Sequence, residues 1–258
     1  MMSSFSKSGT GTFLFGIVSY GVFLGVFLYA IGFIGGFGTP TTLDGLAQRP
    51  VIEALAIDFA LLGLFAVQHS VMARPAFKRW WTRIVPETAE RSVYVLLSSL
   101  ALVALFVFWE PIGGVIWSTQ GLARAGVIAV YLLGWVLLLY STFLIDHFDL
   151  FGLRQVWNRL RGNSYEAPKF YTPSLYRIVR HPLYVGWLTI FWAAPTMTVA
   201  HLVFAIGTTA YILIAIQLEE RDLVAAFGDT YVEYRRGTPM LIPRLWRQRA
   251  AQGTEAKT

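Results

Sequence analysis

Long apolar segments alternate with short polar ones along this chain. Four apolar stretches can each cross about 30 Å of hydrocarbon as a helix of about 20 residues, and they lie near residues 13–37, 52–72, 92–109 and 126–148. A fifth apolar region, residues 183–217, fits either a hairpin of two shorter helices that turns at Ala200 and His201, or one long tilted helix beside a broken one. We favour the hairpin. The pattern therefore predicts an all-α fold, a polytopic integral membrane helix bundle with five to six transmembrane helices.

The composition agrees with a chain that lies mostly in lipid. Of its 258 residues, 55% are hydrophobic and 14% are charged, whereas soluble domains carry about 25% charged residues. Because the chain has no cysteine, disulfides, a thiolate nucleophile and cysteine-ligated zinc are excluded. The net charge of +6 comes from basic residues in the gaps between apolar segments, which indicates membrane topology and predicts no nucleic-acid partner.

The distribution of basic residues predicts an orientation. With a cytoplasmic N-terminus, all but two of the 21 Lys and Arg residues face the cytoplasm, and the exceptions are Arg49 and Arg124. The first apolar run follows Lys7 and is longer than the hydrophobic part of a usual signal peptide, so we interpret it as a retained span. Both termini are then expected to be cytoplasmic.

Ionisable groups collect at the predicted cytoplasmic ends of the spans. Charged groups beside a span are costly and are therefore candidates for function, although each one alone could simply extend to the interface. Four separate chain regions reach this one membrane depth, and their polar residues are Gln68, His69, Asp146, His147, Asp149, Arg180, His181, Glu219 and Glu220.

Two of these histidines are candidate general bases. Asp146 stands beside His147 and can orient its imidazole or raise its pKa, which suits proton removal near neutral pH. His69 is the second candidate of the same type. The chain's four histidines lack the i, i+4 spacing of a helical metal motif, and His201 is expected on the opposite membrane face, so no metal site is predicted.

The string from Ser174 to Gly186, Ser-Leu-Tyr-Arg-Ile-Val-Arg-His-Pro-Leu-Tyr-Val-Gly, is the most specific in the sequence. Pro182 suits the first turn of a helix, and Gly186 lets another chain or a ligand approach its backbone. This places Arg180 and His181 at a helix N-terminus, where exposed amides and the helix dipole favour an anionic group such as a carboxylate.

Together with Glu219-Glu220 and the later Phe-Gly-Asp-Thr-Tyr pattern, this string resembles the superfamily of isoprenylcysteine carboxyl methyltransferases and phospholipid methyltransferases over about residues 172–243. The resemblance implies that the stretch binds S-adenosylmethionine, with S-adenosylhomocysteine as product, through His181, Tyr184, Gly186, Glu219 and Glu220. Ser174 replaces a glycine common in that superfamily.

The residue types suit this cofactor. Arg180 and His181 can meet its carboxylate, Glu219 or Glu220 can accept hydrogen bonds from its ammonium or ribose diol, and aromatic faces at Tyr184, Trp187 or Tyr231 favour its cationic sulfur. The chain then divides into residues 1–150, a transmembrane bundle on the substrate side, and residues 151–258, a cytoplasmic loop, helical hairpin and cofactor-binding region.

Three further segments, residues 65–81, 109–114 and 143–157, resemble the bacterial methanethiol S-methyltransferases, and that similarity covers roughly residues 13–247. The resemblance implies an enzyme of the bacterial inner membrane that methylates a small thiol, methanethiol, to dimethyl sulfide. A volatile apolar thiol partitions readily into hydrocarbon. Because only a few per cent of such a thiol is ionised at pH 7, a base such as His147 would assist.

Two alternatives stay open. The acceptor could be larger, a lipid amine or a prenylcysteine carboxylate, which needs a lateral opening between helices rather than a closed pocket. The chain could instead be a non-catalytic membrane protein of the type linked to nitrite and nitric oxide metabolism, which resembles the N-terminal half. Membrane lipids are partners in each case, and the sequence leaves the oligomeric state open.

Overall fold

The structure, a computed structural model, describes residues 9–166 and 169–244. Within this part of the chain, five helices are long and apolar enough to cross a membrane: α2 (Gly9–Gly35), α3 (Val51–Ala73), α5 (Glu87–Phe108), α6 (Gly121–Leu144) and α10 (Val199–Phe227). The predicted all-α integral membrane bundle is confirmed. The predicted cytoplasmic location of both termini, and Lys7 with it, concerns residues outside the described ranges.

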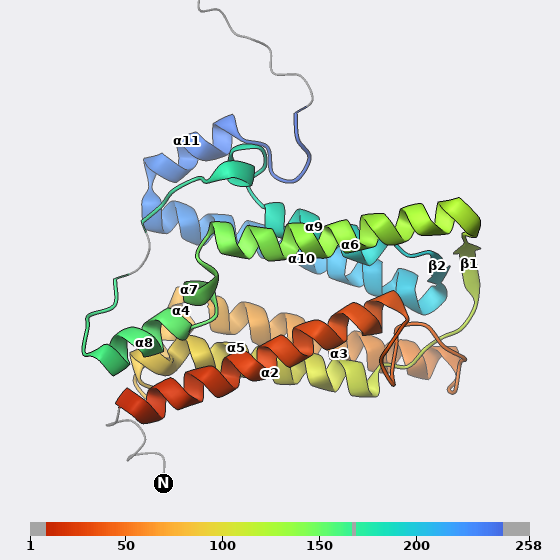
Figure 1. Cartoon of the computed structure of the whole chain (residues 1–258), viewed down its shortest axis with the longest axis horizontal. Coiled ribbons are helices and arrows are strands. Elements are labelled where there is room, and N and C mark those ends of the chain that lie inside the picture. The colour runs from red at the N-terminus through yellow and green to blue at the C-terminus, as the bar shows by residue number, and fades with distance from the viewer. Residues whose placement is uncertain (1–8, 167–168, 245–258) are drawn as a thin grey trace, which may run out of the picture.

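Short elements connect these helices, and all but α9 lie at the two ends of the bundle (Figure 1). They are α4 (Pro75–Trp81), β1 (Val115–Ser118), α7 (His147–Leu150), α8 (Leu153–Arg161), the 3-10 helix η1 (Ser174–Arg177), α9 (Pro182–Trp192), β2 (Thr196–Thr198) and α11 (Asp229–Gly237). Helices α4, α7, α8 and α11 lie toward one end, which we call the short-helix end (Figure 1). Strands β1 and β2 pair antiparallel at the other, the sheet end.

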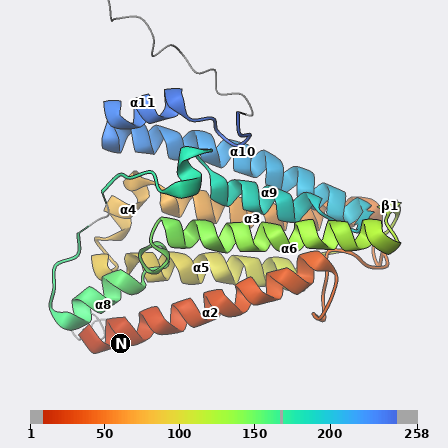
Figure 2. The same cartoon turned by 45° about the horizontal axis from the view of Figure 1, so that its top comes forward.

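The helices form two layers of three. In one layer α5 packs between α2 and α3, and in the other α9 packs between α6 and α10. Figures 1 and 2 show the two layers running side by side along the long axis. Helix α3 also contacts α10, so the layers meet there as well as through the side chains described below.

Close packing of α6 on α9 depends on glycine. A Cβ atom on Gly186 would lie 2.9 Å from the backbone nitrogen of Leu138, and one on Gly134 would lie 3.1 Å from the backbone nitrogen of Ile190. Backbone cannot move aside as a flexible side chain can, so a larger residue would force the helices apart. Continued by one turn, this antiparallel register brings Thr142 level with Pro182, the first residue of α9.

The fifth apolar region differs from the hairpin that we favoured. Helix α9 has 11 residues and α10 has 29, and the turn lies before α10 rather than at Ala200 and His201, which belong to its first turn. The Thr198 hydroxyl fixes this start, because it accepts a hydrogen bond from the backbone N–H of His201 at 3.1 Å. The favoured turn at Ala200 and His201 is therefore wrong, and the region has one long helix, α10, beside the short helix α9.

Apolar side chains cover the outside of the bundle. Val67 on α3 is 64% exposed and Leu133 on α6 is 61% exposed, and helix α3 buries only three of its 23 residues. Exposed apolar faces of this size on helices of membrane-spanning length mean contact with lipid. The chain is an integral membrane protein.

Candidate functional site

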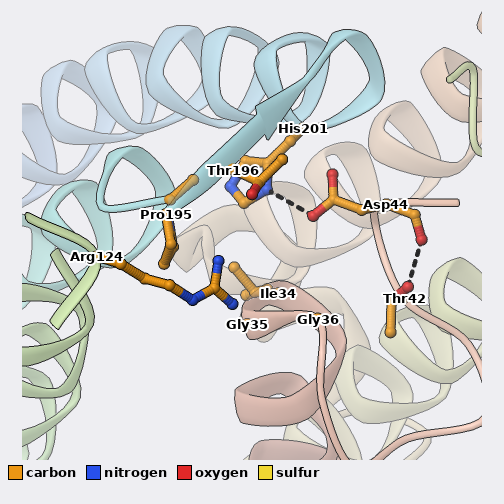
Figure 3. A pocket seen from close by; sticks show the side chains of 10 residues that line it. Ile34, Gly35, Gly36, Thr42, Asp44, Arg124, Pro195, Thr196 and His201 are labelled. Carbon is orange, nitrogen blue, oxygen red and sulfur yellow. Dashed lines mark hydrogen bonds and ion pairs between the residues drawn. The ribbon is translucent and has the colours of Figure 1, made fainter. Parts of the chain in front are cut away.

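At the sheet end, a pocket of about 220 Å³ lies between the two layers. Asp44 accepts a hydrogen bond from Thr198 at 2.5 Å and lies 3.4 Å from His201 Nδ1. Arg124 extends its guanidinium toward the same pocket (Figure 3). His201 thus lies at the end of the bundle opposite the short helices, as predicted.

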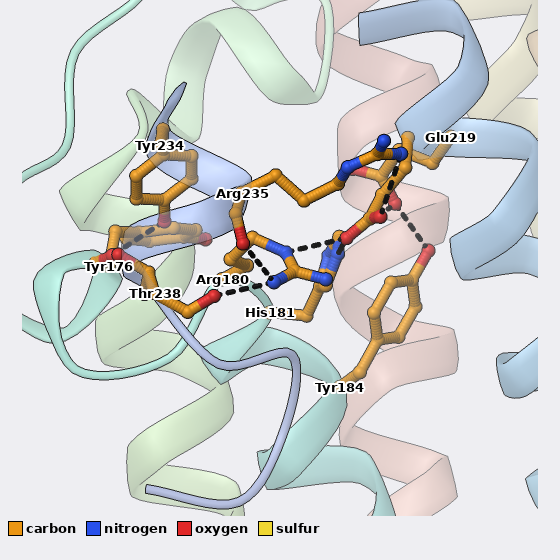
Figure 4. Close-up of polar contacts among 9 residues, drawn as sticks. Tyr176, Arg180, His181, Tyr184, Glu219, Tyr234, Arg235 and Thr238 are labelled. Carbon is orange, nitrogen blue, oxygen red and sulfur yellow. Dashed lines mark hydrogen bonds and ion pairs between the residues drawn. The ribbon is translucent and has the colours of Figure 1, made fainter. Parts of the chain in front are cut away.

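At the short-helix end, Glu220 is the centre of a buried ionic cluster, and its partners Arg180 and His181 are labelled in Figure 4. Its Oε1 accepts from Arg180 Nε at 2.7 Å and from His181 Nε2 at 3.0 Å. The side chains of Arg180, His181 and Glu220 are 10%, 5% and 6% exposed. The Arg180 and His181 side chains, which we expected to receive an external carboxylate, therefore bind the chain's own carboxylate.

Arg180 also anchors the segment that follows α11. Its Nη1 donates to the carbonyl oxygens of Arg235 at 3.0 Å and Thr238 at 2.5 Å. The backbone N–H groups of Arg180 and His181 donate to the carbonyls of Pro239 and Met240. The donors of Arg180 are thus largely used within the chain, which gives this residue a structural task.

Glu219 is the accessible carboxylate of the cluster. Tyr184 donates its hydroxyl to Glu219 Oε2 at 2.9 Å, and His181 Nδ1 lies 4.0 Å from the same oxygen. The Glu219 side chain is 42% exposed, and within the described residues no hydrogen bond reaches its Oε1. Of the cofactor residues predicted, Glu219 has both an open acceptor and solvent access.

Gly186, also predicted to contact the cofactor, faces α6 instead. Its missing side chain is explained by the approach of Leu138 described above. Ser174, where the related superfamily has glycine, adopts a positive φ of 38°, a left-handed conformation that glycine adopts without strain. Ser174 thus holds the turn that leads into the cluster in a backbone conformation that costs a non-glycine residue some free energy.

Tyrosines of α11 line the outer side of the cluster. Tyr231 is 2% exposed and packs against Phe170 and Tyr234, so its ring is not open to a cationic ligand. Burial raises the pKa of Tyr234 to about 12, and its hydroxyl donates to the carbonyl of Tyr176 at 2.5 Å. These phenols are neutral at pH 7 and hold α11 against the loop before α9.

His147 lies between the two layers, at the end of α6. Its Nδ1 is 2.8 Å from Thr142 Oγ1 and its Nε2 is 2.9 Å from the hydroxyl of Tyr20 on α2. Phe143 stacks on the ring at a centroid distance of 4.4 Å, and Phe151 packs beside it at 4.8 Å. Burial lowers the pKa of His147, and the nearby Asp146 carboxylate offsets part of this effect.

Asp146 does not orient His147 directly. With φ at 78° it caps α7 by accepting from the backbone N–H of Asp149 at 3.1 Å, and it pairs with Arg154 at 2.5 Å. Both ring nitrogens of His147 have the other partners given above. Asp146 therefore makes no hydrogen bond that would orient the ring, because the left-handed backbone turns its carboxylate toward α7 and α8. The other expected effect, an upward influence of the nearby carboxylate on the pKa of His147, agrees in direction with the structure, although burial outweighs it.

His69 lies between α3 and α5. Its Nδ1 is 3.1 Å from Ser98 Oγ and its Nε2 is 2.9 Å from the Tyr94 hydroxyl. The next residue, Ser70, donates to Tyr211 on α10 at 3.2 Å. His69 is thus bound by α5 and its neighbour Ser70 by α10, whereas His147 is bound by Tyr20 of α2.

Several polar partners in the site were not predicted. Sequence reasoning found the ionisable groups but not the hydroxyls that bind the two histidines, which are Tyr20, Thr142, Tyr94 and Ser98. It also missed the hydrogen bond between Ser70 and Tyr211 beside His69. Isolated Tyr and Ser residues in apolar runs were the available signal, but such residues also bond to their own helix, as Ser141 does. Within the described residues no group of three or more His, Asp and Glu suits a metal ion.

The fold and this site define an integral membrane protein with a buried ionic cluster at one end of its helices. The chain matches the NnrU protein family over residues 59–244. It is 54% identical over 243 residues to a methanethiol S-methyltransferase of Crocosphaera subtropica, covering 94% of this chain and 95% of that protein. It is 52% identical over 233 residues to the methanethiol S-methyltransferase of Mycobacterium tuberculosis, covering 90% and 96%.

Nurim of Rattus norvegicus is a more distant relative, 33% identical over 191 residues that cover 70% of this chain and 72% of Nurim. No solved structure matches the chain significantly. The chain belongs to the NnrU protein family and, within it, to the group of the methanethiol S-methyltransferases.

Proposed function

We propose that this protein is a membrane methyltransferase that transfers a methyl group from S-adenosylmethionine to methanethiol, which gives dimethyl sulfide. The observation that carries the proposal is identity above 50% to methanethiol S-methyltransferases of separate organisms, over at least nine tenths of each chain. We expected this resemblance in the N-terminal half, but the NnrU match extends to residue 244. It therefore includes the Arg180–Glu220 cluster. The non-catalytic alternative is not favoured.

The short-helix end is the site that we assign to the methyl donor. S-adenosylmethionine, when bound, supplies a methyl group activated by a positively charged sulfur. Its ammonium and ribose hydroxyls are donors, and the open Oε1 of Glu219 is an acceptor with access to solvent. The Tyr184 hydroxyl holds this carboxylate in place, and the Glu220 cluster holds His181 and the start of α9.

The acceptor site then lies between the layers, beside the aromatic side chains at the inner end of α6. At this depth His147 is buried and neutral near pH 7, because burial lowers its pKa. A neutral imidazole can take the proton that the thiol loses when its sulfur is methylated. Alignment of the two reactants by the surrounding helices supplies much of the remaining acceleration.

The proposed arrangement in the membrane follows the charge pattern. Arg49 precedes α3, and Arg124 lies in the first turn of α6. Both arginines are at the sheet end. The other basic residues within the described part of the chain flank the short-helix end, so we assign that end to the cytoplasm of a bacterial inner membrane. S-adenosylmethionine is a cytoplasmic metabolite, and this orientation gives it access to Glu219.

The acceptor can be tested with purified protein in lipid nanodiscs. The protein would be incubated with methyl-labelled S-adenosylmethionine and, in separate reactions, methanethiol, a phospholipid amine and a prenylcysteine. We expect label in dimethyl sulfide in the headspace. In the other two products we expect no more label than in a control reaction with protein-free nanodiscs. Label in the lipid or the prenylcysteine, with none in dimethyl sulfide, would contradict the assignment.

A further inference from the structure

The Tyr20 hydroxyl on α2 lies 2.9 Å from His147 Nε2, and this contact has a chemical consequence. The hydroxyl of Thr142 is 2.7 Å from the carbonyl oxygen of Leu139 and 2.8 Å from His147 Nδ1. A hydroxyl has one hydrogen, and a carbonyl can only accept, so Thr142 donates to Leu139. It must then accept from the ring, which places the hydrogen of a neutral His147 on Nδ1.

The lone pair of His147 is therefore on Nε2, the nitrogen that faces Tyr20 at 2.9 Å. The Tyr20 hydroxyl donates to it, because the neutral ring has no hydrogen there to give. Phe143 covers one face of the imidazole and Phe151 packs beside it. With His147 only 4% exposed, the basic nitrogen is reached through the Tyr20 oxygen.

From this geometry we infer that Tyr20 is a catalytic residue that relays the proton of the thiol substrate to His147. The inference rests on the proposed function. The thiol S–H gives its proton to the Tyr20 oxygen while the Tyr20 O–H gives its own proton to His147 Nε2. Tyr20 ends neutral, His147 ends as an imidazolium, and the sulfur keeps the electron pair with which it attacks the methyl group.

The surroundings suit this transfer. Tyr20 is half-buried on α2. Its ring packs against Phe23 and Phe151. The face of Phe143, stacked on the ring of His147, stabilises an imidazolium at this position. The hydrogen bond joins α2 in one layer to the end of α6 in the other, at the depth where Thr142 comes level with α9.

The test compares Tyr20→Phe with Tyr29→Phe, which removes a tyrosine hydroxyl that lies further along α2 and bonds Thr41 instead of a histidine. We expect Tyr20→Phe to lower kcat for methanethiol by about 10²-fold, in the range of acid–base catalysis, with unchanged affinity for S-adenosylhomocysteine. The loss should shrink as pH rises, since more thiol is ionised. Tyr29→Phe should keep the wild-type kcat and pH profile.

A second readout needs no cofactor. With ¹⁵N-labelled histidine, we expect the NMR signals of His147, assigned by their loss in His147→Gln, to show hydrogen on Nδ1 in the wild type. Thr142→Val should release this preference and lower kcat. A wild-type kcat in Tyr20→Phe, or hydrogen on Nε2 in the wild type, would overturn the relay. A wild-type protein that makes no dimethyl sulfide but shows the Nδ1 hydrogen would instead contradict the proposed function.

Discussion

Replacing Glu220 with glutamine is expected to destabilise the protein by about 3–5 kcal/mol, the usual cost of breaking a buried ion pair. The carboxylate is the shared partner of Arg180 and His181, both buried at the start of α9. Glutamine keeps the shape but removes the charge, so the guanidinium stays buried without a counter-charge. Arg180 also holds the segment after α11 through Arg235 and Thr238, so that segment should loosen as well.

The measurement is the midpoint of thermal unfolding in detergent, together with the rate of proteolysis after α11. Glu233→Gln is the matched control, because Glu233 is an exposed glutamate on α11. We expect a large decrease in the midpoint and faster cleavage for Glu220→Gln, and neither for Glu233→Gln. Equal midpoints in the two variants would show that the cluster does not stabilise the fold.

His147→Ala is expected to lower turnover of methanethiol by about 10²–10⁴-fold, the usual contribution of general acid–base catalysis, with nearly constant cofactor affinity. Burial lowers the pKa of His147, so the wild-type ring is neutral and able to accept a proton at pH 7. Activity of the wild type should fall only when the pH drops below the ordinary histidine range. The variant should lack this acidic limb and recover as pH rises toward the thiol pKa, about 8.5 for a reference thiol.

The variant Asp146→Asn distinguishes the contribution of Asp146 to turnover from that of its neighbour His147. Asparagine tolerates the left-handed backbone of this position and can still accept from the N–H of Asp149, so we expect a loss of less than about tenfold, well below the general-base range. A rate profile with pH over the range 5 to 9 for all three proteins gives the comparison. Near-normal turnover in His147→Ala would transfer the role to His69 or show that alignment of the reactants suffices.

The spans were predictable because each apolar run is long and ends in charged residues. The fourth predicted span continued to residue 148, whereas α6 ends at Leu144, because hydropathy does not report the positive φ at Asp146. The prediction for the fifth apolar region was wrong for a similar reason. The start of α10 depends on Thr198 and on its contact with Asp44, which lies more than 150 residues earlier. Contacts between distant segments are not encoded in a local pattern.

The site was predictable as a set of charges but not as a geometry. The motif around Arg180 and His181 was found together with Glu219 and Glu220, yet the sequence could not show that Glu220 binds the side chains of Arg180 and His181. Nor could adjacency of Asp146 and His147 reveal that the ring is bound by Tyr20 and Thr142. One of these partners comes from another helix, which only the fold brings near.

The central claim is that the short-helix end binds the methyl donor. Calorimetric titration of the nanodisc-embedded protein with S-adenosylhomocysteine tests it most directly. We predict one binding site per chain, an affinity reduced about 10- to 100-fold in Glu219→Gln, as expected for loss of a hydrogen bond to a charged group, and unchanged affinity in Glu233→Gln. An absence of binding heat in the wild type, or equal affinity in Glu219→Gln, would contradict the account.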